Sequence, residues 1–413
     1  MTRYAELAAE YGTPLYVYDL DRVAEARRAL FAALPESFEL YYAMKANPHP
    51  EVAAVLREDP DRACRAEISS TGELAAALAA GFPAGDCLYT GPGKTAAELD
   101  AAIGAGVRTF SVESPGDLRH IGAAARRHGA VADCLLRINS VSASASTSIR
   151  MTGAPSQFGI DRETLDELLP ELLRVPGTRI AGAHFFPLSN AKDEASLLAE
   201  FEHTLAVAAE LRDTLGLPVR LLDIGGGFAM PYGVPGERPR YDKLRSGLEA
   251  ALDARFPDWR EGTPRFACES GRYLVGGCGE LLCGVVNVKE SRGRGFAILD
   301  GGINVFGGMA GLGRLLPVAV RPSGAEASRR ATLAGPLCTP GDFLGREVEV
   351  PPLAEGDVVA VPNAGAYGVT ASLLMFLGRP AATEVVVRGG EVVSVSRIEH
   401  RRNFDVPRAG AHR

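Results

Sequence analysis

The sequence lacks the features that mark membrane proteins, disulfide-stabilised proteins and nucleic-acid-binding proteins. It contains no run of about 18 apolar residues, which argues against a transmembrane helix. Its seven cysteines include no Cys-x-x-Cys pair and show no framework spacing, so we expect reduced thiols, with neither disulfides nor a zinc or other metal site. The net charge of −7 disfavours a partner that is a nucleic acid or an anionic membrane.

The first residues also lack the apolar core of a signal peptide. The segment "MTRYAELAAEYGTP" is typical of an amphipathic helix, and we therefore expect a cytoplasmic protein. The chain has 413 residues, of which 46% are hydrophobic. This is enough for two domains with substantial cores.

Strand-like and helix-like segments alternate from residue 39 to about residue 270. Several of the strand-like segments are continuously apolar, as expected for strands buried on both faces of a parallel sheet. Eight such units in roughly 230 residues are typical of a (β/α)8 barrel, and an open doubly wound sheet is the alternative. The predicted strands are 39–44, 63–67, 87–90, 108–112, 132–138, 179–185, 219–224 and 265–269.

The pattern changes after residue 270. Segments such as "GELLCGVVNVKE" and "TEVVVRGGEVVSVSR" are typical of strands with glycine turns, the second being a hairpin around Gly389 and Gly390. They predict a second, mostly antiparallel domain. The early strand "PLYVYD" precedes the barrel and is expected to pair with this domain, which would make the domain discontinuous. We expect a barrel domain of residues 20–275 and a discontinuous β-sandwich or β-barrel domain of residues 1–19 and 276–413.

Polar residues and glycines follow the predicted barrel strands, at the end where such barrels carry their active sites. A lysine at a strand end is usually exposed, but a desolvated lysine beside charged groups can form a Schiff base. A run of three glycines allows backbone N–H groups to approach a phosphate, although it can also be a simple tight turn. These positions are Lys45, Glu67, Glu113, Arg137, His184, Gly225, Gly226, Gly227 and Glu269.

A series of motifs resembles one known family over nearly the whole chain. In order, the motifs are "YYAMKAN", "EISSTGEL", "GPGK", "LLRIN", "QFGID", "LDIGGGF", "ESGRYLV", "GPLCTPGD" and "NAGAYG". The chain is similar to the fold-type III pyridoxal-phosphate (PLP) decarboxylases, which include ornithine and diaminopimelate decarboxylases and are related to alanine racemase. The resemblance implies an α/β (β/α)8 barrel with a C-terminal, mostly antiparallel β domain. It also implies the cofactor PLP and a homodimer with shared active sites.

The resemblance gives a role to each matching position. Lys45 would bind PLP as a Schiff base, and Glu269 would keep the pyridine nitrogen protonated. Cys338 would reach the partner subunit's site and protonate the carbanion after CO₂ leaves, whereas the alternative for a free cysteine is a small buried hydrophobe. Glu67 and Arg137 would lie near the phenolic side of the cofactor. The implied phosphate contacts are Ser189, Gly225, Gly226, Gly227, Arg272 and Tyr367.

Two departures from the family pattern concern the ring and the substrate. The sixth strand usually ends in H-x-H-x-G-S, but here it reads "HFFPLS", so Phe186 takes the place of the ring-stacking histidine and His184 lies two residues earlier. Diamine-forming members carry an acidic residue after the cysteine, whereas this chain has Thr339, which cannot compensate a buried ammonium. Asp342 could partly substitute. The Arg-Pro-x-x-Tyr pattern of a diaminopimelate site is also absent.

The substrate is therefore expected to have a neutral distal end. "STSIRMTGAPSQFGID", "GPLCTPGDFLG" and "FLGRP" resemble the branch of the family that decarboxylates a glutamyl group on an acyl carrier protein in butirosin biosynthesis. This predicts decarboxylation of an acidic amino acid, of the glutamate or methylaspartate type, on an acyl carrier protein in secondary metabolism. The alternatives are decarboxylation of free diaminopimelate, ornithine or lysine, an amino-acid racemase, or a non-catalytic regulator. A racemase would need a catalytic tyrosine where Cys338 lies.

Overall fold

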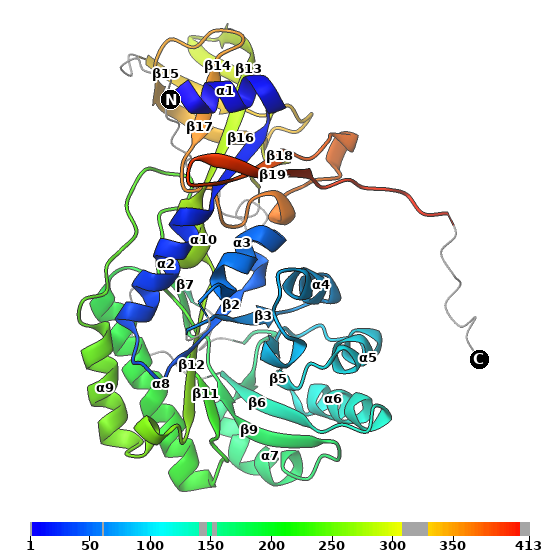
Figure 1. Ribbon diagram of the computed structural model, residues 1–413, viewed down its shortest axis with the longest axis vertical. Coiled ribbons are helices and arrows are strands. Elements are labelled where there is room, and N and C mark those ends of the chain that lie inside the picture. The colour runs from blue at the N-terminus through cyan, green and yellow to red at the C-terminus, as the bar shows by residue number, and fades with distance from the viewer. Residues whose placement is uncertain (1, 60–61, 140–146, 151–154, 308–328, 405–413) are drawn as a thin grey trace. The chain divides into compact units, whose positions relative to one another are not determined.

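The computed structural model describes residues 2–59, 62–139, 147–150, 155–307 and 329–404 (Figure 1). Parts of the motifs "STSIRMTGAPSQFGID" and "DGGINVFGGMAGLGRLLP" lie outside these residues. The chain divides into two compact units, of which the larger contains residues 18–279 and 363–366, and the smaller contains residues 1–17, 280–362 and 367–413. Among the described residues, no helix combines the length and the apolar character that a membrane span requires.

The larger unit is a closed barrel of parallel strands, because the last strand of the series, β12, pairs with the first, β2. This closure confirms the predicted (β/α)8 barrel, and the alternative of an open doubly wound sheet was wrong. All eight predicted strands form. Their bounds are β2 (Glu39–Ala43), β3 (Arg65–Ile68), β4 (Cys87–Tyr89), β5 (Thr109–Val112), β6 (Ala132–Asn139), β9 (Thr178–His184), β11 (Leu221–Asp223) and β12 (Arg265–Ser270).

The inside of the barrel is filled by one side chain from each of several strands. A large tyrosine on β2 is complemented by alanines on β9 and β12, so that the side chains of this layer pack together. The phenol is fully enclosed, and burial strongly raises the pKa of Tyr41 above its usual value. The residues of this layer are Tyr41, Leu88, Leu135, Ala181, Leu221 and Ala267.

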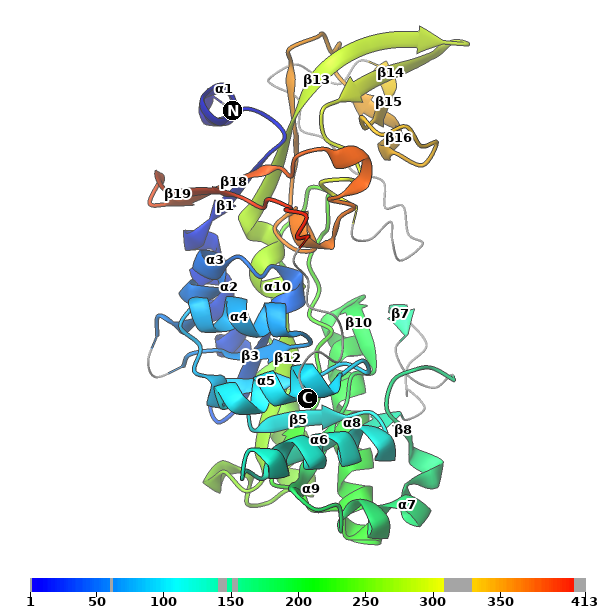
Figure 2. The same ribbon diagram turned by 90° about the vertical axis from the view of Figure 1, so that its right-hand side faces the viewer.

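Helices surround the barrel, and α4, α5 and α6 lie side by side on one flank (Figure 2). Their first turns are closed by side chains. Thr95 accepts a hydrogen bond from the Glu98 N–H, and the Glu98 carboxylate accepts one from the Thr95 N–H in a capping box. The helices are α2 (Leu20–Ala33), α3 (Pro50–Ala54), α4 (Thr71–Ala79), α5 (Ala96–Ala105), α6 (Pro115–Arg127), α7 (Leu165–Leu172), α8 (Glu194–Leu215), α9 (Leu244–Arg255) and α10 (Arg272–Val275).

The smaller unit is built on an eight-stranded sheet in the order β16-β15-β14-β13-β1-β18-β19, with β17 also paired to β13. The pairs β13–β14, β13–β17, β15–β16 and β18–β19 are antiparallel, whereas β14–β15 is parallel. The predicted mostly antiparallel domain is therefore confirmed. The strands are β1 (Leu15–Asp19), β13 (Gly279–Ser291), β14 (Arg294–Leu299), β15 (Arg329–Ala334), β16 (Phe343–Val350), β17 (Val358–Val361), β18 (Thr383–Arg388) and β19 (Glu391–Arg397).

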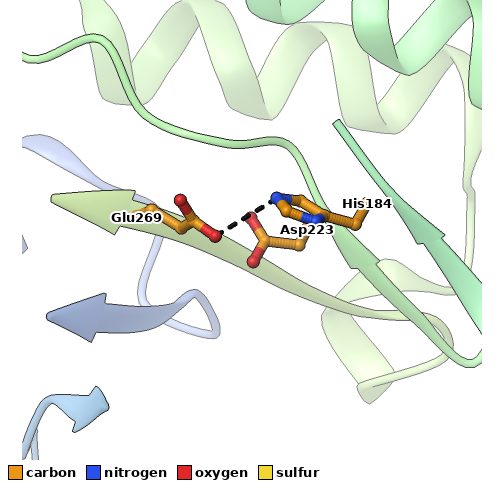
Figure 3. Close-up of side chains that lie close together, drawn as sticks. All are labelled: His184, Asp223 and Glu269. Atoms are coloured by element: carbon orange, nitrogen blue, oxygen red, sulfur yellow. Dashed lines mark ion pairs between the residues drawn. The ribbon is translucent and has the colours of Figure 1, made fainter. Parts of the chain in front are cut away.

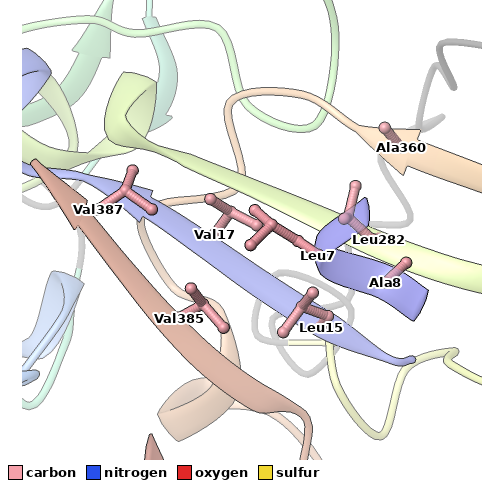
Figure 4. Packing of buried hydrophobic residues seen from close by; sticks show 8 residues of the cluster. All are labelled: Leu7, Ala8, Leu15, Val17, Leu282, Ala360, Val385 and Val387. Atoms are coloured by element: carbon pink, nitrogen blue, oxygen red, sulfur yellow. The ribbon is translucent and has the colours of Figure 1, made fainter. Parts of the chain in front are cut away.

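The early strand β1 lies between β13 and β18, so segments far apart in the sequence form one core. Helix α1 (Thr2–Tyr11) places Leu7 and Ala8 against this part of the sheet (Figure 4). The hairpin β18–β19 turns at Gly389 and Gly390, which both have positive φ, as a tight two-residue turn requires. The cluster comprises Leu7, Ala8, Leu15, Val17, Leu282, Ala360, Val385 and Val387.

Candidate active site

Lys45 lies directly after β2, in the 3-10 turn η1 (Met44–Ala46). Its neighbours Met44 and Ala46 are buried, but 42% of the lysine side chain is exposed. The amine lies 3.1 and 3.0 Å from the two carboxylate oxygens of Glu67, and 5.6 Å from the ring centroid of Phe186. The buried turn thus holds an accessible amine between a carboxylate and an aromatic ring.

Glu67, at the end of β3, is only 2% exposed and is held from two sides. Besides the Lys45 amine, it accepts a hydrogen bond from the Thr90 hydroxyl, which also lies 2.9 Å from the Ser69 hydroxyl. Thr90 was not among the site residues predicted from the sequence. It ends the predicted strand 87–90, so its place at a strand end was the available signal.

Arg137, on β6, forms a buried ion pair with Glu113 at 2.9 Å. The second carboxylate oxygen of Glu113 accepts a hydrogen bond from the Gly159 N–H at 2.7 Å. The guanidinium lies over the Phe158 ring, 4.6 Å from its centroid. The pair therefore fixes the motif "QFGID" against the ends of β5 and β6.

A cluster of three buried ionisable groups lies at the ends of β9, β11 and β12 (Figure 3). His184 Nε2 lies 3.2 Å from Glu269 Oε1, and His184 Nδ1 lies 2.7 Å from the hydroxyl of Ser111. Asp223 accepts a hydrogen bond from the Gly225 N–H at 2.9 Å. The ligand atoms of the three ionisable groups lie within 4.8 Å of one another, so the cluster could face a divalent cation or a protonated ring nitrogen.

Burial and mutual attraction act on these groups in opposite directions. Burial alone would lower the pKa of His184 and raise that of Glu269, but their ion pair outweighs it, so the pKa of His184 is raised and that of Glu269 is lowered. Burial, aided by the nearby Glu269 carboxylate, raises the pKa of Asp223 to about 7. Glu269 is therefore the ionised carboxylate, and Asp223 is the one that retains a proton near neutrality.

The substitution Asp223→Asn is expected to change how stability depends on pH. The pKa of Asp223 rises from 3.8 to about 7 on folding, so its contribution is fully present below about pH 4 and is lost as pH rises through 7. Asparagine still accepts a hydrogen bond from the Gly225 N–H but does not ionise. We expect the melting temperature of the cofactor-free variant, relative to the wild type, to increase from pH 5 to pH 8.

The matched control is Asp242→Asn, at an exposed carboxyl group of the same unit, for which we expect no such trend. If both variants differed from the wild type by a constant amount across this pH range, Asp223 would not retain the proton.

The loop Gly225–Gly227 follows β11 and is pressed against its neighbours. A Cβ atom at Gly225 would lie 2.3 Å from the Phe185 carbonyl oxygen, and one at Gly226 would lie 2.7 Å from the Glu269 carbonyl oxygen. Gly225 and Gly227 also have φ of +79° and +116°. Glycine is therefore required at these positions by packing against the backbone of Phe185 and Glu269. A run of glycine backbone of this kind can also present N–H groups to a phosphate group.

Aromatic rings support this loop. Phe228 lies 5.9, 5.6 and 6.2 Å, centroid to centroid, from Phe201, Tyr241 and Tyr273. The Tyr241 hydroxyl also accepts a hydrogen bond from the Ala229 N–H at 2.9 Å. These ring contacts and this hydrogen bond hold the segment after the glycine loop in place.

Two further predicted phosphate contacts also belong to the larger unit. Arg272 is buried at the start of α10, with its guanidinium 5.2 Å from the Tyr232 ring centroid. Ser189 is half-buried in β10 (Leu188–Ala191), which pairs with β7 (Thr147–Arg150).

Four predicted site residues belong to the smaller unit: Cys338, Thr339, Asp342 and Tyr367. Cys338 is exposed, whereas the six other cysteines are buried, and Thr339 is half-buried. Tyr367 has a φ of +51°. Asp342 is 3% exposed, and its two oxygens accept hydrogen bonds from the backbone N–H groups of Ile303 and Leu337 at 2.8 and 2.6 Å. The Asp342 carboxylate thus joins the loops that carry Ile303 and Leu337, and its contact with the substrate stays a prediction.

Residues 20–276 match the family model of the pyridoxal-binding domain of pyridoxal-dependent decarboxylases. The chain belongs to this family. It is a PLP-dependent amino-acid decarboxylase, as the motifs predicted, and not a racemase or a non-catalytic regulator. The matched range includes Lys45, Glu67, Arg137 and Glu269.

Individual decarboxylases are similar over nearly the whole chain. The L-glutamyl-[BtrI acyl-carrier protein] decarboxylase of Niallia circulans is 32% identical over 403 residues, which cover 95% of this chain and 92% of that protein. The diaminopimelate decarboxylase of Methanothermobacter thermautotrophicus is 33% identical over 397 residues, covering 94% and 89%. The structure of the Helicobacter pylori diaminopimelate decarboxylase complexed with L-lysine matches with a TM-score of 0.81, at 25% identity and 95% coverage of both chains.

The residues of this decarboxylase fit PLP chemically. The accessible Lys45 amine can react with an aldehyde, and the three successive glycines after β11 have no side chains to separate their backbone from a phosphate group. Among the described residues, Glu269 Oε1 is a buried oxygen that makes an ion pair with His184 but no hydrogen bond. A buried, ionised carboxylate of this kind complements a protonated ring nitrogen, because a buried charge is stable only when it is paired.

Proposed function

We propose that the enzyme decarboxylates an acidic amino acid, of the glutamate or methylaspartate type, that is tethered to an acyl carrier protein. The observation that carries this proposal is Thr339, a neutral and half-buried residue directly after the exposed Cys338. A substrate with a distal ammonium would meet no charge from this position, whereas a thioester-linked side chain is neutral there. The similarity to the decarboxylase of Niallia circulans supports the same substrate class.

The proposed roles follow from the positions of the side chains. PLP, when bound, supplies an electron-accepting ring for the electrons that remain when CO₂ leaves. Lys45 would bind the aldehyde of the cofactor, and the anionic Glu269 would keep the ring nitrogen protonated. Phe186, whose ring centroid lies 5.6 Å from the Lys45 amine, would stack on the ring. Glu67 and Arg137 would hold its phenolic side. The residues that would hold the phosphate are Ser189, Gly225, Gly226, Gly227, Arg272 and Tyr367.

We also propose a homodimer in which Cys338 acts in the partner's active site. Its exposure supports this role, since a thiol that serves another subunit must lie on the surface of its own. The thiol then delivers a proton to the substrate carbon that has lost CO₂.

A CO₂-release assay on carrier-bound and free amino acids tests the substrate class. We expect turnover of glutamyl or methylaspartyl groups on a carrier protein, and little turnover of free ornithine, lysine or diaminopimelate. The substitution Thr339→Glu places a negative charge beside the neutral side chain and should lower kcat/KM for the carrier-bound substrate by about tenfold or more. Thr263→Glu, at an exposed position before β12, is the matched control and should have no effect.

Rapid turnover of a free diamino acid, with none of any carrier-bound substrate, would contradict this proposal. It would favour the activity named for the relative from Methanothermobacter thermautotrophicus.

A further inference from the structure

The His184 imidazole lies beside Glu269, with Nδ1 in a hydrogen bond and Nε2 in an ion pair. Nδ1 is 2.7 Å from the Ser111 hydroxyl, and Nε2 is 3.2 Å from Glu269 Oε1. The ring is 2% exposed. We propose that His184, fixed by Ser111, is a positioning residue that keeps the Glu269 carboxylate ionised and oriented for the ring nitrogen. This inference rests on the role proposed for Glu269.

The direction of the His184 side chain is set by an irregularity in β9. The register of β6 and β9 shifts between Cys134, which pairs with Ile180, and Leu135, which pairs with Gly182. Beyond the shift, Gly182 is level with the inward-facing Leu221, so His184, two residues later, also points inward.

Only glycine permits this arrangement. A Cβ at position 182 would lie 1.8 Å from the Leu221 carbonyl oxygen. The close approach of β9 and β11 therefore turns His184 toward the active site.

His184 lies in a row of charged groups across three neighbouring strands. It is in register with Arg137 on β6 and with Asp223 on β11. Glu269 approaches from β12. The charge of Lys45 lowers the pKa of Glu269, and the charge of Glu67 raises the pKa of Asp223. The imidazole is thus the group that lies between an arginine and two carboxylates.

The imidazole decides which of the two carboxylates is ionised. Two buried carboxyl groups this close cannot both ionise easily, so one of them retains a proton. The ion pair with His184 lowers the pKa of Glu269, while the pKa of Asp223 is raised. Without His184 the proton would be shared between both, and the ring nitrogen would face a weaker anion.

The test compares the binding of PLP with that of its 1-deaza analogue, in which carbon replaces the ring nitrogen. Dissociation constants are measured on the full chain, after removal of bound cofactor, for the wild type, His184→Gln, Glu269→Gln and the double variant. We expect His184→Gln to reduce the preference for PLP over the analogue by about tenfold. In the Glu269→Gln background the same change should add nothing, because both residues act through one contact. Ser111→Ala should shift the preference in the same direction by less.

The matched control is His128→Gln, which removes a surface histidine 3.3 Å from Asp100 and should leave the preference unchanged. Equal weakening of PLP and its analogue by His184→Gln would overturn the inference and leave His184 a packing role. If Glu269→Gln changes the preference but His184→Gln does not, the inference alone fails. If Glu269→Gln also leaves it unchanged, the role proposed for Glu269 fails with it.

Discussion

Replacing Lys45 with arginine is expected to lower kcat/KM for decarboxylation by roughly 10⁴-fold. A guanidinium remains protonated and does not form a Schiff base with an aldehyde. It still places a positive charge near Glu67, 3.0 Å from the amine in the wild type, so the fold should persist. The loss would therefore report on covalent cofactor binding and not on unfolding.

Borohydride reduction followed by peptide mass spectrometry locates the cofactor directly. The wild type should carry a pyridoxyl group on the peptide containing Lys45, and Lys45→Arg should carry none there. Lys289→Arg, at an exposed lysine of β13, is the matched control and should retain both the adduct and full activity. An adduct on the buried Lys94, or an active Lys45→Arg variant, would refute the role of Lys45.

The substitution Gly225→Ala is expected to reduce the free energy of unfolding by about 3 to 5 kcal/mol. The new Cβ would lie 2.3 Å from the Phe185 carbonyl oxygen, a backbone atom that cannot rotate away. The φ of +79° adds strain that an alanine does not relieve. Denaturant unfolding of the purified variant measures the loss.

A substitution at a second glycine, Gly216, distinguishes the effect of backbone strain from that of the steric clash. Gly216, after α8, has a φ of +66°, but a Cβ there would have no neighbour within 4 Å. Gly216→Ala should therefore cost only about 1 kcal/mol. Equal small losses at the two positions would show that the loop does not press against the Phe185 carbonyl group after β9.

The glycine loop also affects Glu269. The Gly225 carbonyl oxygen accepts a hydrogen bond from the Glu269 N–H at 2.9 Å. If the loop moves to accommodate a methyl group, the carboxylate moves with it. Gly225→Ala should therefore weaken PLP binding as well as stability, whereas Gly216→Ala should leave PLP binding unchanged.

Local patterns in the sequence were sufficient to predict the barrel and the polar residues at its rim. Each apolar run of a few residues ended at a polar residue or at glycine, as in "YYAMK" and "LLDIGGG". Such patterns arise because a strand buried on both faces must be apolar until it reaches the rim. Lys45 and Glu269 were identified in this way, and the ordered motifs added the chemistry.

The contacts of other site residues became clear only from the three-dimensional structure. Asp223 and Ser111 lie inside apolar runs, where periodicity marks them as buried without showing what they face. Asp342 follows the cysteine motif closely, yet its carboxylate is used by the backbone of Ile303 and Leu337.

The sequence by itself determined which segments are strands, where each one ends, and which residue types stand at the rim. Those properties depend on near neighbours in the chain. Barrel closure and the register shift before Gly182 decided that His184 meets Glu269, with Ser111 behind it and Asp223 beside it. These contacts join strands that are far apart in the chain, so only the packed barrel brings the groups within range of one another's charge.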